Sequence, residues 1–259
     1  MNILFDTHCH LCLDEFQEDL DSVVQRAFDR GVQYILVPGL DLRTSVRAIS
    51  ISEKYPTIFA AIGFHPQTQG KWDLRIAKEF EELSVHPKVV AIGEIGLDQF
   101  QSEVSCDEQE IRFQAQLQIA LQVHKPVLLH NRGETKSLLK LLSEAVSNSA
   151  SSLQGVFHAY GGDPDIFSFA EKYNFYLGIG GIITFPKSTQ LRQLAPKVLA
   201  RVILETDSPE LAPKPYRGKR NEPGYLPIIC KYLSEITEQT DEKLSGLTTK
   251  NAMSLLRIK

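Results

Sequence analysis

The sequence has little cysteine, no excess of either charge and no long apolar run, and each shortage excludes a class of protein. Its four cysteines have neither the number nor the spacing of a disulfide framework, and no second pair follows Cys9 and Cys12 at zinc-ribbon spacing. We therefore expect four free thiols, at Cys9, Cys12, Cys106 and Cys230, in a reducing cytoplasm.

The net charge is -4, from 28 basic and 32 acidic residues among 259. Such a balance excludes a protein that coats nucleic acid through its overall charge, so any contact with nucleic acid must be local. The chain does not open with a basic stretch and an apolar core, so we expect no signal peptide. No apolar run is long enough to span a membrane. We expect a cytoplasmic monomer with no membrane partner and no obligate protein partner.

Eight short apolar segments alternate with amphipathic ones. They comprise residues 3–5, 32–37, 58–63, 89–94, 126–129, 155–157, 175–179 and 202–204. Short, almost wholly apolar strands are typical of a parallel sheet covered by helices. Eight strand–helix units in about 250 residues match the size of a (β/α)8 barrel. We therefore predict an α/β fold, a single-domain (β/α)8 TIM barrel over residues 1–259, with a doubly wound open sheet as the competing topology.

One of the amphipathic segments carries a helix start signal. Ser105 followed by Glu108 predicts a capping box and a long helix behind it. On that helix an apolar stripe, which we expect to face the core, is formed by Ile111, Ala115, Ile119 and Val123.

Polar side chains stand at the C-terminal ends of at least six predicted strands. In a barrel these ends gather on the catalytic face, whereas an open sheet would hold its first and last strands far apart. Residues two apart on an extended chain point the same way, so His8 and His10 can converge on one ion, with Asp6 on the same side. The candidate residues are His8, His10, His65, Glu94, His130, His158 and Asp207.

Six of these residues are candidate metal ligands: His8, His10, Glu94, His130, His158 and Asp207. Six ligands exceed the needs of one tetrahedral catalytic zinc and suit two divalent cations with a bridging carboxylate, for which Glu94 is the natural candidate. Two such cations would leave the site net positive, which favours an anionic substrate. Imidazole favours zinc and carboxylate favours magnesium or manganese, so all three metals stay open.

Two arginines near these ligands are candidate phosphate contacts. Arg132 follows His130 by two residues, and Arg217 lies in the basic segment after Asp207. A guanidinium group matches phosphate geometry with two parallel hydrogen bonds. We expect Lys214 and Lys219 to be solvated, whereas Phe100 and Tyr216 could either stack on a base or pack against the protein.

With these residues in hand, the sequence resembles the TatD family of metal-dependent hydrolases from end to end. The resemblance lies in seven motifs: Asp6–His10 (DTHCH), Gly63–Pro66 (GFHP), Gly93–Asp98 (GEIGLD), Leu129–Arg132 (LHNR), Phe157–Gly161 (FHAYG), Glu205–Pro209 (ETDSP) and Arg217–Pro223 (RGKRNEP). It implies a TIM barrel that binds divalent metals and includes deoxyribonucleases. It also implies the same six metal ligands, and Asn221 in the last motif as a substrate contact.

The sequence departs from the family pattern at two places. Family members commonly follow Gly-Leu-Asp with two tyrosines, where this chain has Gln99 and Phe100. They also commonly carry Asp-Ala after the arginine of the fourth motif, where this chain has Gly133 and Glu134. Both departures lie beside the pocket and not among the ligands, so they leave hydrolysis intact and the physiological substrate open.

Our mechanistic hypothesis is that a metal-activated hydroxide attacks the phosphorus of a phosphoester, such as a DNA end or a nucleotide. Asp207 would bind one metal and orient or deprotonate the nucleophile, and Glu94 would bridge. His65 would contact substrate or donate a proton, and Glu205 would support the site from behind the ligands.

Two alternatives remain at this stage. An amidohydrolase acting on a cyclic amide or lactone uses the same barrel logic, although it often bridges its metals with a modified lysine where this chain has Glu94. A non-catalytic metal-binding or partner-binding barrel is the other alternative, and the intact ligand set argues against it.

Overall fold

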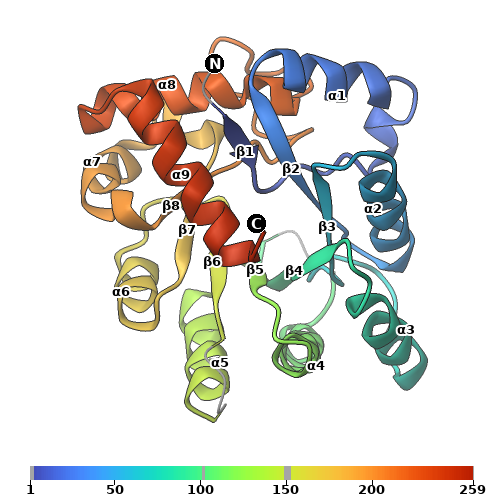
Figure 1. Cartoon of the computed structure of the whole chain (residues 1–259). Helices are drawn as coiled ribbons and strands as arrows, with labels where there is room; N and C mark the ends of the chain where they lie inside the picture. The colour runs from blue at the N-terminus through green and yellow to red at the C-terminus, as the bar shows by residue number, and fades with distance from the viewer. Residues whose placement is uncertain (1–2, 101–102, 149–152, 259) are drawn as a thin grey trace.

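In the computed structural model, which describes residues 3–100, 103–148 and 153–258, eight parallel strands run in chain order through one sheet (Figure 1). The strands are β1 (Leu4–Asp6), β2 (Val32–Pro38), β3 (Ile58–Ile62), β4 (Val89–Asp98), β5 (Val127–Arg132), β6 (Gly155–Phe157), β7 (Tyr176–Ile179) and β8 (Val202–Leu204). The helices are α1 (Leu20–Asp29), α2 (Leu42–Lys54), α3 (Leu74–Ser84), α4 (Cys106–Gln122), α5 (Thr135–Asn148), α6 (Pro164–Tyr173), α7 (Thr189–Val198), α8 (Leu226–Thr237) and α9 (Asp241–Leu256). The predicted (β/α)8 TIM barrel is confirmed.

The first and last strands meet through the segments that follow them. The Thr7 amide donates to the Leu204 carbonyl at 3.0 Å, and the Asp207 amide donates to the His8 carbonyl at 2.8 Å. A third bond joins the His10 amide to the Ser208 carbonyl at 2.8 Å. These bonds exclude the open sheet, and they bring the two ends of the chain together where the candidate ligands lie.

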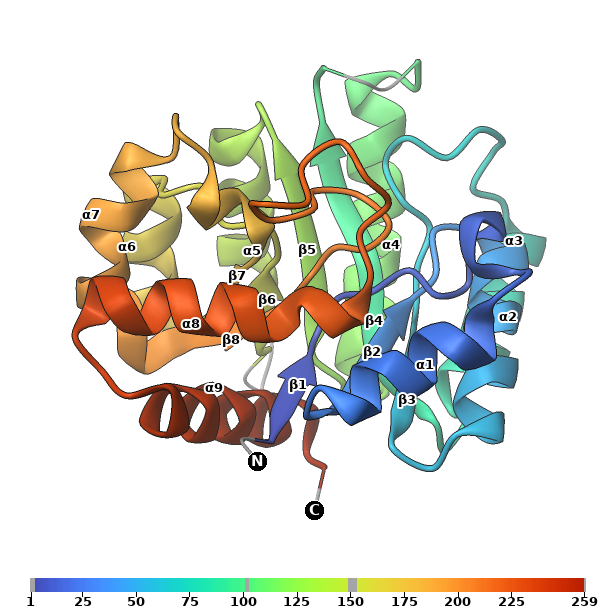
Figure 2. The ribbon, with the colours of Figure 1, turned by 90° about the horizontal axis from the view of Figure 1, so that it is seen from above.

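One end of the barrel is covered by α9. Seven strands contribute an inward residue to a buried cluster that also contains Ala252, Leu255 and Leu256 of α9. The Thr249 hydroxyl donates to the Ile3 carbonyl and the Asn251 amide to the Val202 carbonyl, so α9 lies across the beginnings of the strands. Figure 1 shows this helix crossing in front of the barrel, and Figure 2 shows it below the strands, which leaves the opposite end, where the strands finish, for the site.

The apolar stripe expected on α4 is right at its C-terminal end, where Ile119 is buried and Val123 packs against the core, and wrong at its start. Ile111 is 55% exposed, whereas the polar side chains of Gln109, Arg112 and Gln116 are buried. The Gln116 amide bonds to both backbone groups of Phe64, at 2.7 Å and 3.1 Å, and Gln109 accepts from the Asp98 amide at 2.8 Å. These polar side chains therefore share the buried face of the helix with Phe113 and Leu117, because the backbone groups at the ends of β3 and β4 need partners.

The remaining expectations concern the thiols and the membrane. All four cysteines are free, and three of them are buried. In the part of the chain that the structure describes, we find no helix with the length and apolar character needed to cross a bilayer.

Candidate metal centre

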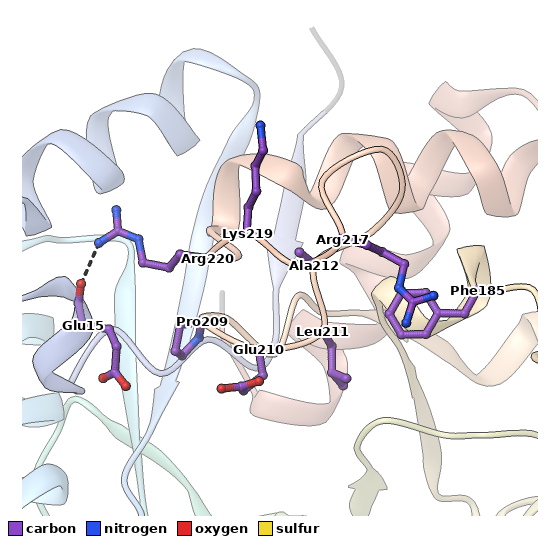
Figure 3. Close-up of a pocket in the computed structure, with 10 residues that line it drawn as sticks. Glu15, Phe185, Pro209, Glu210, Leu211, Ala212, Arg217, Lys219 and Arg220 are labelled. Atoms are coloured by element: carbon purple, nitrogen blue, oxygen red, sulfur yellow. Dashed lines mark hydrogen bonds between the residues drawn. The ribbon is translucent and has the colours of Figure 1, made fainter.

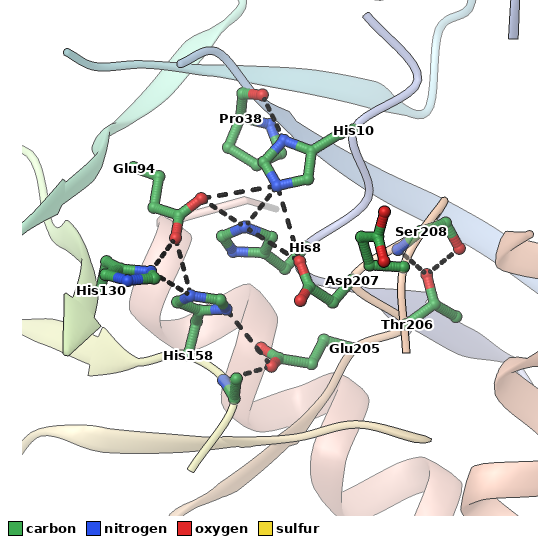
Figure 4. Close-up of polar contacts among 12 residues, drawn as sticks. His8, His10, Pro38, Glu94, His130, His158, Glu205, Thr206, Asp207 and Ser208 are labelled. Carbon is green, nitrogen blue, oxygen red and sulfur yellow. Dashed lines mark hydrogen bonds and ion pairs between the residues drawn. The ribbon is translucent and has the colours of Figure 1, made fainter. Parts of the chain in front are cut away.

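Four of the candidate ligands, all histidines, converge on the carboxylate of a fifth, Glu94, which is 2% exposed (Figure 4). Its Oε2 lies 3.2 Å from His8 Nε2 and 3.4 Å from His10 Nε2. Its Oε1 lies 2.8 Å from His130 Nδ1 and 2.7 Å from His158 Nε2. Each oxygen of this one carboxylate therefore faces a different pair of imidazoles.

Asp207 joins the pair on the Oε2 side. Its Oδ1 lies 3.5 Å from His10 Nε2 and 3.8 Å from His8 Nε2. On the Oε1 side a further imidazole approaches, because His65 Nε2 lies 3.4 Å from Glu94 Oε1. The structure thus brings together side chains that are separated by about two hundred residues in the sequence.

The segment after β1 positions both of its histidines. His8 Nε2 and His10 Nε2 are 3.2 Å apart, as their spacing in the sequence suggests. Asp6 does not point with them, because its carboxylate accepts from the Thr206 amide at 2.9 Å and the Thr206 hydroxyl at 2.6 Å. Burial raises the pKa of Asp6 to about 8 against the effect of these bonds. Asp6 therefore ties the end of β1 to the end of β8.

The backbone takes uncommon conformations at the site. Asp207 has φ +57°, and Ala159, directly after His158, has φ +47°. Non-glycine residues seldom adopt this left-handed region, and such residues cluster at functional sites. Close packing also requires Gly96, where a Cβ atom would lie 1.9 Å from the His130 carbonyl oxygen. A side chain at Gly96 would push β5, and with it His130, away from Glu94.

Hydrogen bonds on the far side of the rings fix how two imidazoles face the centre. His10 Nδ1 lies 3.1 Å from the Pro38 carbonyl oxygen, so Nδ1 carries the hydrogen and the Nε2 lone pair faces Glu94. His130 Nε2 lies 3.0 Å from Asp98 Oδ2, which leaves the Nδ1 lone pair for the centre. Such outer contacts are typical of metal-binding histidines.

This donor set fits a bound cation. Lone pairs of imidazole and carboxylate point at one another across 2.7–3.5 Å, and acceptors in that arrangement need a proton or a cation between them. Without a cation, protons take its place between these groups. Burial opposes positive charge on His10 and His158, yet neighbouring carboxylates raise the pKa of both. Burial likewise opposes charge on Glu94, but the imidazoles around it hold its pKa well below the usual value.

The two arginines expected to contact substrate are both exposed. Arg132 is exposed at the end of β5, with its guanidinium carbon 6.0 Å from the centre of the Phe100 ring. Arg217 lines a surface cavity of about 440 Å³ and lies 4.2 Å over the ring of Phe185 (Figure 3). Lys214 and Lys219 are exposed, as expected.

Asn221 does not reach the centre. It is fully buried, and its amide nitrogen donates to the carbonyls of Thr206 and Glu210 at 2.8 Å and 2.7 Å. Its Oδ1 accepts from the Glu222 amide at 3.0 Å. All three bonds go to backbone groups, so the side chain holds the loop after β8 and has no donor left for a substrate. Tyr216 packs in the same loop, with its ring stacked 4.2 Å from that of Tyr225.

Two carboxylates behind the ligands complete the centre. Glu205, for which we expected a supporting role, accepts from the Ala159 amide at 2.5 Å, and the same oxygen lies 3.8 Å from His158 Nδ1. Asp98, the partner of His130, is 1% exposed and was not identified as a site residue from the sequence. The available signal was its place on β4, four residues after Glu94 and therefore on the same side of an extended strand.

Comparison with known proteins agrees with this geometry. Residues 5–257 match the family described as TatD-related DNase. An uncharacterized metal-dependent hydrolase of Bacillus subtilis, YabD, is 37% identical, with 99% of this chain and 100% of the relative covered. The 3'-5' ssDNA/RNA exonuclease TatD of Escherichia coli is 32% identical, with 98% of this chain and 99% of the relative covered.

Solved structures agree as well. The crystal structure of YjjV, a TatD homologue from Escherichia coli, superposes with a TM-score of 0.91 at 27% identity, covering 99% of this chain and 98% of the other. A TatD-family hydrolase from Entamoeba histolytica has the same fold, with a TM-score of 0.85 at 23% identity over 98% of each chain.

Proposed function

We propose that this chain, which belongs to the family of TatD-related DNases and is a metal-dependent hydrolase, cleaves phosphodiester bonds with the help of two divalent cations. The observation that supports this proposal is that the two carboxylate oxygens of Glu94 face separate pairs of imidazoles. A carboxylate in that position is suited to bridging two cations.

The proposed sites lie on either side of Glu94. His8, His10, Asp207 and Oε2 of Glu94 would hold one cation, and His130, His158 and Oε1 of Glu94 would hold the other. Zinc, magnesium or manganese would act there as a Lewis acid and make a bound water more acidic. The family match and the relatives described as metal-dependent hydrolases support the presence of metal but leave the number and identity of the ions to this proposal.

The side chains around the ligands would handle the substrate. Asp207 would orient the attacking water and accept its proton. His65 Nδ1 accepts from the Gln67 amide at 3.2 Å, so in the neutral ring Nε2 carries a hydrogen that faces the centre. Burial lowers the pKa of His65, which favours that neutral form. His65 is thus placed to donate a hydrogen bond to a substrate oxygen.

The substrate class follows from charge. Two divalent cations would outweigh Glu94 and Asp207, and the guanidinium groups of Arg132 and Arg217 would add positive charge at the rim. We propose DNA ends or nucleotides as substrates, in keeping with the relatives described as 3'-5' ssDNA/RNA exonucleases. We also propose that the whole chain acts as one domain, as a monomer in the cytoplasm.

The test is a screen of single-stranded DNA, nucleotide monoesters and a cyclic amide or lactone with zinc, magnesium and manganese in turn. We expect hydrolysis of the phosphoesters and a loss of at least about a hundredfold in E94Q, because an amide bridges two cations poorly. Hydrolysis of only the amide or lactone would overturn the proposal, and so would full phosphoester turnover by folded E94Q.

A further inference from the structure

The two places where the sequence departs from the family pattern lie against each other in space. A Cβ atom on Gly133 would lie 2.5 Å from Cε2 of Phe100 and 3.0 Å from Oε1 of Gln99. Gly133 also has φ +86°, a conformation that favours glycine. The absence of a side chain at Gly133 therefore makes the space in which the Phe100 ring rests.

The Phe100 ring stands at the rim of the metal centre. Its backbone amide donates to Asp98 Oδ1 at 2.8 Å, and the other oxygen of Asp98 lies 3.0 Å from His130 Nε2. Asp98 and Arg132 are paired neighbours on β4 and β5. The ring is thus held from both strands, through Asp98 at the end of β4 and through Gly133 directly after β5.

Packing on Gly133 does not account for the whole ring. Phe100 is 69% exposed, and among the large apolar side chains exposed in the described part of the chain it alone is aromatic. An open aromatic face beside a positively charged group is the arrangement on which nucleic-acid bases stack. The guanidinium of Arg132, 6.0 Å from the ring centre, supplies the charge.

We infer that Phe100, seated on Gly133 beside Arg132, is a stacking platform for a nucleobase of a single-stranded substrate. The inference rests on the proposed function and narrows it. The enzyme would distinguish nucleic acid from other phosphodiesters by the flat face of a base, while Arg132 holds a neighbouring phosphate. The aromatic ring of the family pattern is retained at position 100, so the departure there removes only a hydroxyl group.

The test compares two single-stranded probes of ten nucleotides, one of thymidine and one with an abasic residue at every position. Both carry the same phosphates, so only the bases differ. Binding is measured by fluorescence anisotropy in EDTA, where no cleavage occurs. We expect the thymidine probe to bind at least about tenfold more tightly, because stacking contributes roughly 1–3 kcal/mol per base.

Four variants locate the platform. F100L should bring the ratio of the two affinities close to one, and F100Y should keep it. G133A alone should lower the affinity ratio, because the added methyl group displaces the Phe100 ring. Combined with F100L, G133A should not change the ratio further. L74A, which removes a side chain 91% exposed at the start of α3, is the control for loss of exposed apolar surface and should keep the wild-type ratio.

A wild-type ratio near one, or a ratio that survives in F100L, would overturn the platform. Cleavage of both probes is measured separately with zinc, magnesium and manganese in turn. If the affinity ratio depends on Phe100 and neither probe is cleaved with any divalent cation, the platform stands and the proposed hydrolysis fails. If both probes are cleaved and the affinity ratio is near one, the proposed hydrolysis stands and the platform fails.

Discussion

The carboxylate of Asp98 lies 3.0 Å from His130 Nε2, on the side of the ring that faces away from Glu94. The same Oδ2 accepts from the side-chain Nε2 of Gln67 at 2.7 Å, and Oδ1 accepts from the backbone amide of Phe100 at 2.8 Å. Both oxygens are therefore occupied by donors, and the bond to His130 directs its Nδ1 lone pair toward the centre. Asp98 orients the imidazole of His130 and holds the segment that carries Phe100.

We predict that D98N binds divalent cations about 10–100-fold more weakly than the wild type, because outer partners of ligating histidines contribute that much to metal affinity. An amide has one accepting oxygen, so its NH2 group must face at least one of the three donors. The measurement is calorimetric titration with zinc or manganese. D41N, a matched change at the cap of α2, should bind cations like the wild type. Unchanged affinity in D98N would contradict the positioning role.

Cation binding should release protons and should weaken as the pH falls. Although burial opposes charge, neighbouring carboxylates raise the pKa of His10, His130 and His158, so these rings keep protons to a higher pH than a free histidine. A cation must displace those protons. Titration in two buffers of different ionisation enthalpy measures the release. Binding without proton release would show that the rings are neutral before the cation arrives.

The same pKa values predict that the stabilising effect of a bound cation depends on pH. In the cation-free protein the raised values stabilise the fold below the unfolded-state pKa of about 6.5, and this contribution is lost as the pH rises through the folded-state pKa. With cation in excess, rising pH favours binding and hence the folded state. His8 and His65, whose pKa values burial lowers, act in the opposite direction without cation. The stabilisation that zinc adds, measured as the difference between thermal unfolding in zinc and in EDTA, should therefore grow as the pH rises.

We predict that Q116A destabilises the protein by about 1–3 kcal/mol, because it leaves both backbone groups of Phe64 buried without a partner. I111A, on the same helix, should change the free energy of unfolding by no more than about 0.5 kcal/mol, since that side chain is 55% exposed. Urea unfolding of the two variants decides the matter. A larger loss in I111A would restore the apolar stripe that the sequence alone suggests.

Asn221 should prove to be a residue of the loop and not of the substrate. N221A removes two bonds to backbone carbonyls and one from the Glu222 amide, so we expect a loss of about 1–3 kcal/mol in stability. R217A, in the same loop and exposed, should leave stability nearly unchanged and raise KM for an oligonucleotide. If N221A kept full stability and raised KM alone, the assignment of Asn221 would be reversed.

The sequence predicts the barrel and the six converging residues because both depend on local patterns. Buried parallel strands are almost wholly apolar, and a histidine or carboxylate directly after such a strand, as at His130 or Asp207, stands out. A closed barrel brings such positions together wherever they lie in the chain, since all strand ends share one face.

The sequence does not predict the contacts of polar side chains that are buried because they hydrogen-bond to the backbone of neighbouring segments. Gln116 faces inward because the Phe64 backbone needs partners, and Asn221 is buried because it bonds three backbone groups of its own loop. The spacing of apolar residues carries no information on which buried backbone groups lack a hydrogen-bond partner. The seat of Phe100 on Gly133 is equally invisible, since the two residues are more than thirty positions apart.

The central claim is that six side chains hold two cations on either side of Glu94, and anomalous X-ray scattering from crystals grown with zinc or manganese tests it most directly. We predict two anomalous peaks, one among His8, His10 and Asp207 and the other between His130 and His158, with an oxygen of Glu94 at each. A single peak at saturating metal, or peaks away from Glu94, would contradict the account.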